Sequence, residues 1–316
     1  MFNTLQYNYL SIFHHPSWFS VLQKTYGFQI KIIGDNNSYG IPFYTNNKKY
    51  VSLPFSDYVK ILTTKEETDR ILRNLILKNS NVSIEIRDKY EGEGFEHKLV
   101  GYTHSLSLIP SEEDIFRSFK KTQVQQPIQQ AIKNGLYSVI RRDIEAINEF
   151  YRLHLLTRKR LGVPIQPKRF FYNLFNEIIQ KNLGFITLVY LENQVISAGI
   201  FCGYGHIMTY KYSASDYNFL KFRPNNLMLW EAIKEAKRRS FEVFDFGRTE
   251  LENEGLRKFK LGWGTKEELL YYSFYPKAPS NSKFIFVKNN IVAPIIRKSP
   301  KFICRLTGEL FYKYFG

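Results

Sequence analysis

The residues best suited to chemistry lie between positions 244 and 264. A predicted strand ends there in Asp245-Phe246-Gly247-Arg248. This places a carboxylate and a guanidinium at the carboxyl edge of a sheet, where open α/β sheets bind ligands. Three further cations follow: Arg257, Lys258 and Lys260. Such a group can bind an anion, stabilise a developing oxyanion or orient a reacting base. The spacing alone equally allows a structural ion pair between Asp245 and Arg248 in a solvated loop.

A second candidate site is the start of a predicted helix at 225–239. The basic segment Lys221-Phe222-Arg223 and Pro224 precede it. The free N–H groups and positive dipole end of a helix attract phosphate, so we count Asn226 among the residues that bind substrate. On the preceding strand, Lys211 and Tyr212 are placed to face the same cleft, although strand alternation equally allows Tyr212 to be buried.

The signatures of several other enzyme classes are missing from the sequence. It contains no Walker loop, dinucleotide fingerprint, HExxH motif or Gly-x-Ser-x-Gly motif. The 6 His residues show no ligand spacing, and Cys202 and Cys304 are too few for a disulfide framework. The sequence therefore predicts free thiols, no metal site and no permanently bound cofactor.

The elements that must position these residues are clearest from Leu136 onward. Apolar periodicity and turn residues predict strand 136–140, helices 143–162 and 167–180, strands 185–191, 195–202 and 206–213, helix 225–239, strand 241–246, a glycine-containing loop and strand 269–274. This β-α-α-β-β-β-α-β-loop-β order predicts an α/β fold, in which helices cover both sides of a mixed sheet.

The first 135 residues show shorter elements. The predicted strands are 28–33, 39–44, 50–53 and 81–87, and the predicted helices are 66–78, one capped by Ser111, and 127–134. The length of 316 residues suggests two domains.

Composition limits the class of protein. Lys and Arg number 45 and Asp and Glu 29, a net charge of +16, and 44% of the residues are hydrophobic. These values exclude an acidic disordered chain. The sequence contains neither a membrane-spanning apolar run nor a signal peptide, so we expect a cytoplasmic protein. The positive charge suits nucleic acid, an anionic membrane surface or phosphate-rich substrates, and compositional bias explains part of it.

The last 40 residues, 277–316, carry eight basic side chains and one acidic one, a net charge of +7. Within them, Phe302, Ile303, Leu306 and Leu310 recur at helical spacing, which predicts an amphipathic helix with a basic polar face. Such a helix either packs on its own domain or lies in a membrane interface.

Several motifs together resemble the Fem-type transferases, also called FemAB-related or BioF2-like, of the GNAT-like acyltransferase superfamily. They are His15–Trp18 with Tyr26-Gly27, Leu53–Tyr58, Gln130–Gly135, Thr157–Gly162, Asp245–Arg248 and, most specifically, Phe259–Gly264. The resemblance spans residues 10–275. It implies two GNAT-like lobes in tandem, which we assign to 1–135 and 136–276, followed by the basic tail 277–316.

The resemblance implies that an amine attacks a thioester or ester carbonyl to give an amide. The Phe-Lys pair of the family motif falls on Phe259 and Lys260. Lys260 is then expected to stabilise the oxyanion or a donor phosphate, and Phe259 to pack beside the reacting ester. Asp245 is expected to orient a base or the acceptor, and Arg248 to bind phosphate or carboxylate.

The remaining expected substrate-binding residues are Asp57, Arg158, Arg160, Lys211, Tyr212, Asn226 and Lys258. Arg158 and Arg160 lie two apart on a helix, so at most one is a close ligand. The resemblance implies an acyl-CoA or an aminoacyl-tRNA as the co-substrate. The sequence lacks both the glycine-rich pyrophosphate loop of typical GNAT enzymes and the coiled-coil arm common in tRNA-dependent ones.

The function predicted from the sequence is N-acylation of an amino group on a cell-envelope glycan or peptidoglycan precursor. The predicted location is the cytoplasm, with the tail as a peripheral contact at the inner membrane face. The alternative is a nonenzymatic basic module that binds tRNA or an anionic membrane surface.

Overall fold

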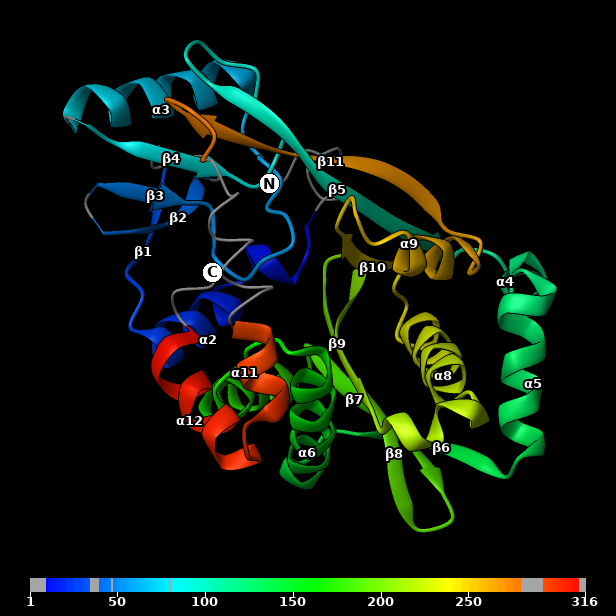
Figure 1. Cartoon of the computed structure of the whole chain (residues 1–316). Helices are drawn as coiled ribbons and strands as arrows, with labels where there is room; N and C mark the ends of the chain where they lie inside the picture. Colours follow the sequence, from blue (N-terminus) through cyan, green and yellow to red (C-terminus); the bar gives the residue numbers. More distant parts are fainter. Residues whose placement is uncertain (1–9, 35–39, 47, 80, 280–291, 313–316) are drawn as a thin grey trace.

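The computed structural model describes residues 10–34, 40–46, 48–79, 81–279 and 292–312. Its strands form one 11-stranded sheet in the order β1-β2-β3-β4-β11-β5-β10-β9-β8-β7-β6 (Figure 1). The strands are β1 (Ile30–Ile33), β2 (Ile41–Thr45), β3 (Lys49–Val51), β4 (Ser83–Ile86), β5 (Glu96–Ser107), β6 (Leu136–Arg141), β7 (Gly184–Leu191), β8 (Gln194–Tyr204), β9 (Ile207–Ser215), β10 (Val243–Thr249) and β11 (Lys266–Tyr275). Parallel and antiparallel pairs both occur, so the predicted mixed sheet is confirmed.

Helices pack on both sides of this sheet. The α-helices are α2 (Pro16–Tyr26), α3 (Lys65–Lys78), α4 (Glu112–Ser118), α5 (Gln126–Lys133), α6 (Ile144–Leu161), α7 (Lys168–Leu174), α8 (Pro224–Arg238), α9 (Glu254–Leu261), α11 (Ala293–Lys298) and α12 (Lys301–Phe311). The 3-10 helices are η1 (Ile12–His14) and η4 (Tyr217–Phe222), and the π-helical segments are η2 (Lys121–Gln125) and η3 (Phe175–Ile179). Within the described ranges, no helix combines the length and apolar character needed to cross a membrane.

Strand β8 is covered by helices on both faces of the sheet. Its residues from Val195 to Gly203 are all buried. Ala198, Ile200 and Cys202 join a core with α2, α6 and α7. Phe201, between Ile200 and Cys202, points to the opposite face and joins a second core with α4, α5 and α8. Ile196 joins this second core as well, because the pairing of β8 with β7 shifts register beside it. Because successive strand residues point to opposite faces, an unbroken apolar strand requires cover on both.

The predicted helix boundaries of α6 follow from its end residues. The side chain of Asp143 accepts a hydrogen bond from the backbone N–H of Ala146 at the N-terminus. Gly162 adopts the left-handed conformation, φ 71°, at the C-terminus. These are the capping arrangements that Asp and Gly favour, and the prediction for this helix is confirmed.

The long strands β5 and β11 join the two halves of the sheet. They pair with each other from Lys266 opposite Ser105 to Phe274 opposite Glu96. On their outer sides, β11 pairs with β4 and β5 pairs with β10. We assigned the strand at 269–274 to the second lobe, but the structure inserts it between strands of the first half. The sheet has no break at residue 135, and the lobe boundaries remain a prediction.

The structure corrects the expected loop after β10. Residues Glu254–Leu261 form the helix α9, in which Asn253 caps the N-terminus by accepting from the backbone N–H of Leu256. Gly255 within this segment and Gly262 directly after it favour a loop, since a glycine inside a helix lowers stability by about 0.5–1 kcal/mol relative to alanine. The packing of Phe259 against Trp263, with ring centroids 6.1 Å apart, and the burial of Lys260 anchor the helix instead.

Candidate functional site

The centre of the site is a turn within β10, where the pairing of β10 with β5 shifts register between Asp245 and Arg248. Strands β9 and β10 are parallel neighbours, but their pairing ends where Asp245 lies opposite Thr209. Gly247 then adopts φ 70°, a left-handed conformation that favours glycine. A Cβ at this position would lie 3.0 Å from Oδ2 of Asp57. The chain therefore turns away from β9 and brings the turn against the Leu53–Tyr58 segment of the first half.

Asp245 holds this turn from within the core. One carboxylate oxygen, Oδ1, accepts from the backbone N–H of Gly247 at 2.8 Å, and Oδ2 accepts from the hydroxyl of Tyr58, also at 2.8 Å. Burial raises the pKa of Asp245 to about 6, although both hydrogen bonds act to lower it. Asp245 thus links the two halves of the molecule, and it is buried beneath the surface of the site.

Lys260 supports the same turn from α9. Its side chain is buried, and its ammonium donates to the carbonyl oxygens of Gly247 at 2.9 Å and Arg248 at 3.0 Å. Burial lowers the pKa of Lys260 to about 8, while the negative charges of Asp57 and Asp245 oppose that shift. An ammonium has three N–H donors, so these two bonds leave one for another acceptor.

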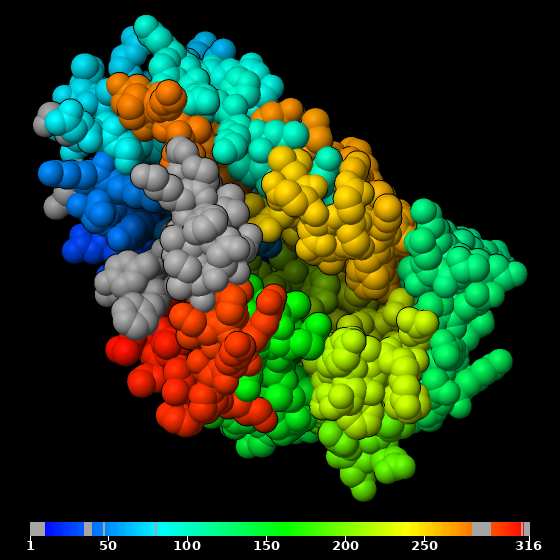
Figure 2. Space-filling model, viewed as in Figure 1, coloured from blue at the N-terminus to red at the C-terminus, as the bar shows by residue number. Residues whose placement is uncertain are grey.

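A cavity of about 590 Å³, here called the β9 pocket, opens between the halves. Figure 2 shows the hollow between α9 (yellow) and the region of α6 and α12 (green and red). The pocket is lined by four cationic side chains and two carboxylates: Arg87, Arg158, Lys211, Arg248, Asp57 and Glu250. Because cations predominate, the β9 pocket suits a ligand that carries phosphate or carboxylate groups.

Lys211 occupies an aromatic environment at the wall of this pocket. Its side chain is 5% exposed, and its Nζ lies 3.1 Å from Oδ1 of Asp57. The same Nζ lies 4.8 Å from the ring centroid of Phe13 and 5.6 Å from that of Trp18. A buried ammonium needs such partners to offset lost hydration. The predicted residues Lys211 and Asp57 therefore fix one another across the two halves.

Arg248 lies beside Tyr272 on another wall. Its guanidinium carbon is 5.4 Å from the ring centroid of Tyr272, and Nη1 donates to the tyrosine hydroxyl at 3.3 Å. That hydroxyl donates to the backbone oxygen of Asp57 at 2.6 Å. The Nε of Arg248 is buried and has no hydrogen-bond partner among the described residues. This N–H is the kind of donor that a bound anion would satisfy.

The side chains of Arg158 and Arg160 lie in different places, as expected for residues two apart on a helix. Arg158 lines the β9 pocket and donates from Nε to the carbonyl oxygen of Pro164 at 2.9 Å. Arg160 lies over the ring of Tyr217, 4.9 Å from its centroid, and is absent from the walls of the pockets described here. The geometry therefore groups Arg158, and not Arg160, with the other expected ligands.

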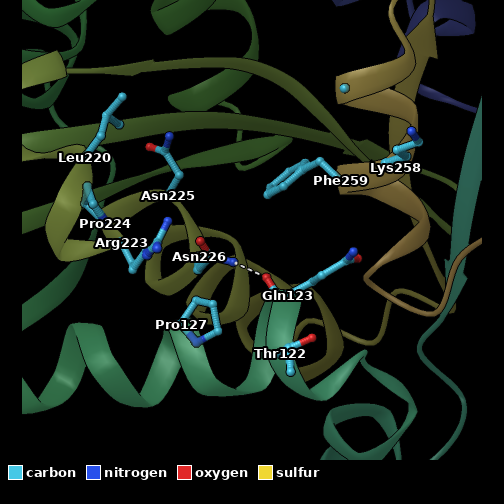
Figure 3. A pocket seen from close by; sticks show the side chains of 11 residues that line it. Thr122, Gln123, Pro127, Leu220, Arg223, Pro224, Asn225, Asn226, Lys258 and Phe259 are labelled. Atoms are coloured by element: carbon cyan, nitrogen blue, oxygen red, sulfur yellow. Dashed lines mark hydrogen bonds between the residues drawn. The ribbon is translucent and has the colours of Figure 1, made fainter.

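A second cavity of about 410 Å³, here called the α8 pocket, lies at the N-terminus of α8. Figure 3 shows Arg223 and Asn226 of the α8 region opposite Lys258 and Phe259 of α9. The amide nitrogen of Asn226 donates to the carbonyl oxygen of Gln123 at 3.4 Å. No side chain caps the first turn of α8, whose N-terminal Arg223 instead adopts a left-handed conformation. The pocket therefore combines a helix N-terminus with two cations.

Helix α9 contributes residues to both pockets. Gly255, Lys258 and Phe259 line the α8 pocket, whereas Leu256 lines the β9 pocket. Of the residues predicted from the sequence, the structure brings Asp57, Arg158, Lys211, Tyr212 and Arg248 to the β9 pocket and Asn226, Lys258 and Phe259 to the α8 pocket. Asp245 and Lys260 lie buried in the turn beside α9.

Sequence reasoning missed Arg87, Tyr272 and the role of Tyr58. Arg87 and Tyr272 lie in or directly beside strands whose pattern matches ordinary half-buried strands. Tyr58 lies at the end of the Leu53–Tyr58 motif, and its bond to Asp245 depends on residues far apart in the sequence. No local signal distinguishes these residues.

Comparisons with known proteins identify the fold. Residues 118–267 match the family described as an acetyltransferase (GNAT) domain. Among solved structures, the chain is similar to FemX at 16% identity and a TM-score of 0.66, over 86% of this chain and 93% of that one. A comparison with curated proteins finds no match.

Two further structures share the fold. One is the C-terminal domain of a putative lysylphosphatidylglycerol synthetase from Agrobacterium fabrum, with 8% identity and a TM-score of 0.59 over 87% of this chain and 91% of that one. The other is L-PGS from Bacillus licheniformis, with 11% identity and a TM-score of 0.57 over 86% and 91%. Residues 118–267 thus match a GNAT acetyltransferase domain, the chain has the Fem-type, GNAT-like fold that its motifs predicted, and the match of the domain supports an acyltransferase.

Proposed function

We propose that this acyltransferase transfers an activated acyl group to an amine of a cell-envelope glycan or peptidoglycan precursor. The observation that carries the proposal is the pair of cationic pockets that α9 helps to line, with Phe259 in the wall of one and Lys260 buried next to it. A transferase needs separate sites for donor and acceptor that meet at the reacting atoms.

The α8 pocket supports binding of the donor. Its helix N-terminus, Arg223 and Lys258 suit the phosphates of an acyl-CoA or of the acceptor end of an aminoacyl-tRNA. Phe259 offers an apolar surface beside the reacting ester or thioester. The β9 pocket supports binding of the acceptor, because its four cationic side chains suit the phosphate or carboxylate groups of such precursors.

In the proposed reaction, the acceptor nitrogen attacks the acyl carbonyl carbon. A C–N bond forms and the C–S or C–O bond to the donor breaks. The proton that the nitrogen loses passes to the departing sulfur or oxygen, which leaves as a thiol or hydroxyl. Lys260 contributes its remaining N–H donor to the developing oxyanion. Its bonds to Gly247 and Arg248 position the turn, and Arg248 anchors the acceptor.

The test compares transfer of label from acyl-CoA and from charged tRNA to acceptors in a cell extract. We expect one donor to be used, and we expect Lys260→Ala to lower kcat by at least about a hundredfold, as loss of an oxyanion donor does. Lys133→Ala, at an exposed helical lysine, is the matched control.

The pH profile tests the charge of Lys260. Because the pKa of Lys260 is about 8, activity that needs the ammonium falls as the pH rises through that value. Lys260→Arg keeps its charge, so the alkaline decline should move to higher pH. Full activity of Lys260→Ala would remove Lys260 from the mechanism. Salt-dependent tRNA binding without transfer would favour the nonenzymatic alternative.

A further inference from the structure

Helix α12 presents its large apolar side chains to solvent. Phe302, Leu306 and Leu310, spaced four residues apart along one side, are 70%, 56% and 56% exposed, and Ile303 beside them is 37% exposed. We call these four residues the α12 apolar face. Figure 1 shows α12 (red) at the edge of the molecule. A surface helix of a globular protein normally turns such a stripe inward, so this one is oriented the opposite way.

The opposite side of α12 explains why the helix cannot rotate inward. Cys304 is buried, with its Sγ 3.4 Å from the carbonyl oxygen of Ile296. Gly308 is packed so closely that a Cβ there would lie 2.3 Å from the carbonyl oxygen of Ile165. Small residues thus fit α12 to the protein body, and the α12 apolar face is fixed outward.

Positive charge borders the α12 apolar face. Exposed cations lie on and just before the helix: Arg297, Lys298, Lys301 and Arg305. Among the described residues, none of these four forms an ion pair with a carboxylate. The one acidic residue of α12, Glu309, accepts from the backbone N–H of Lys168 at 2.8 Å and pairs with Arg169 at 3.6 Å. Among the described residues, no carboxylate of the chain therefore neutralises these four positive charges.

The C-terminal end of α12 reaches the β9 pocket. Tyr312 follows the helix, lines the pocket and stacks on Phe55 with ring centroids 5.3 Å apart. A surface that docks on α12 would therefore lie close to this pocket.

We propose that the α12 apolar face is a docking surface for an anionic phospholipid membrane. The apolar side chains enter the acyl-chain boundary, and the four cations contact lipid phosphates. A second copy of the chain suits this surface less well, because self-association would bring two cationic borders together. The proposal stands independently of the acyl-transfer function.

Vesicle flotation with the full-length chain tests the proposal. We expect binding to vesicles that contain phosphatidylcholine and phosphatidylglycerol, and much weaker binding to phosphatidylcholine alone. The double variant Leu306→Glu/Leu310→Glu should reduce the bound fraction by about tenfold or more, since it places charge at the acyl-chain boundary. The control Leu77→Glu/Ile109→Glu alters apolar residues elsewhere that are more exposed than Leu306 and Leu310, and it should bind normally.

The cationic border has its own pair of variants. Lys301→Glu/Arg305→Glu should lose most binding to the anionic vesicles, whereas Lys121→Glu/Lys133→Glu, with the same change in net charge, should lose less. Acyl transfer to a water-soluble amine should be unchanged in every one of these variants. Failure of docking is thereby distinguished from failure of the proposed reaction.

Fluorescence gives a measurement that does not depend on disruptive variants. The variant Phe302→Trp should show a blue-shifted difference spectrum with anionic vesicles and quenching by brominated lipid. Equal binding of the Leu306→Glu/Leu310→Glu variant, or an unshifted difference spectrum of the Phe302→Trp variant, would overturn the proposal. Sedimentation showing a dimer that Leu306→Glu/Leu310→Glu dissociates would also overturn it, in favour of a second copy.

Discussion

At the residue scale, the charge of Asp245 is set by burial acting against two hydrogen bonds. The folded pKa of about 6 lies above the ordinary 3.8. Between these values the folded protein binds more protons than the unfolded chain, so its stability falls as pH rises toward 6 and is lowest above it. Since each pKa unit corresponds to about 1.4 kcal/mol, the contribution amounts to about 3 kcal/mol.

We therefore expect the stability difference between the wild-type chain and Asp245→Asn to depend on pH. The advantage of the wild-type chain should shrink by about 2–3 kcal/mol from about pH 4 to about pH 7. Urea unfolding across this range measures it. Tyr58→Phe serves as a control, because losing the hydroxyl that stabilises the carboxylate should move the change to higher pH. A difference that stays constant with pH would contradict the burial argument.

At the scale of elements, α9 is the part of the site whose conformation the sequence indicated least directly. Capped, periodic helices such as α6 could be predicted because their end residues act locally. Helix α9 could not, because Gly255 and Gly262 weaken its local signal and tertiary contacts of Phe259 and Lys260 decide its conformation. The same limit applies to the site: sequence named most of its residues, but their division between two pockets depends on where α9 packs.

Two glycines beside the site should respond oppositely to alanine. Gly255 has an ordinary helical conformation and open space around its missing Cβ. Gly255→Ala should therefore raise the free energy of unfolding by about 0.5–1 kcal/mol, while the added methyl group narrows the α8 pocket and raises the KM for the donor. Gly247→Ala should instead destabilise by about 1–3 kcal/mol, since its φ is 70° and a Cβ would meet Asp57. Urea unfolding measures the stability of both variants, and steady-state kinetics measure the KM of Gly255→Ala. If Gly255→Ala destabilised the protein as much as Gly247→Ala, the assignment of α9 as a helix would be refuted.

At the scale of the whole molecule, both the sheet and the β9 pocket depend on contacts between residues far apart in the sequence. Strand β11 comes from the end of the second half yet pairs with β4 and β5, and Asp57 meets Lys211 across the halves. Sequence periodicity predicted most strands but not their order, because pairing between distant strands leaves no local pattern. The two predicted lobes therefore share a continuous sheet.

This continuity predicts that the chain unfolds as one cooperative unit. If either half opened alone, β5 and β11 would lose partners and leave buried backbone groups unpaired, which is costly. Urea transitions followed by far-ultraviolet circular dichroism and by fluorescence should coincide, since Trp18 lies in the core shared by both halves and Trp263 in the second core. Replacing Trp18 with Phe should leave the fluorescence midpoint and the dichroism midpoint together. Two separated transitions would instead mean that the lobes at 1–135 and 136–276 are independent folding units despite the shared sheet.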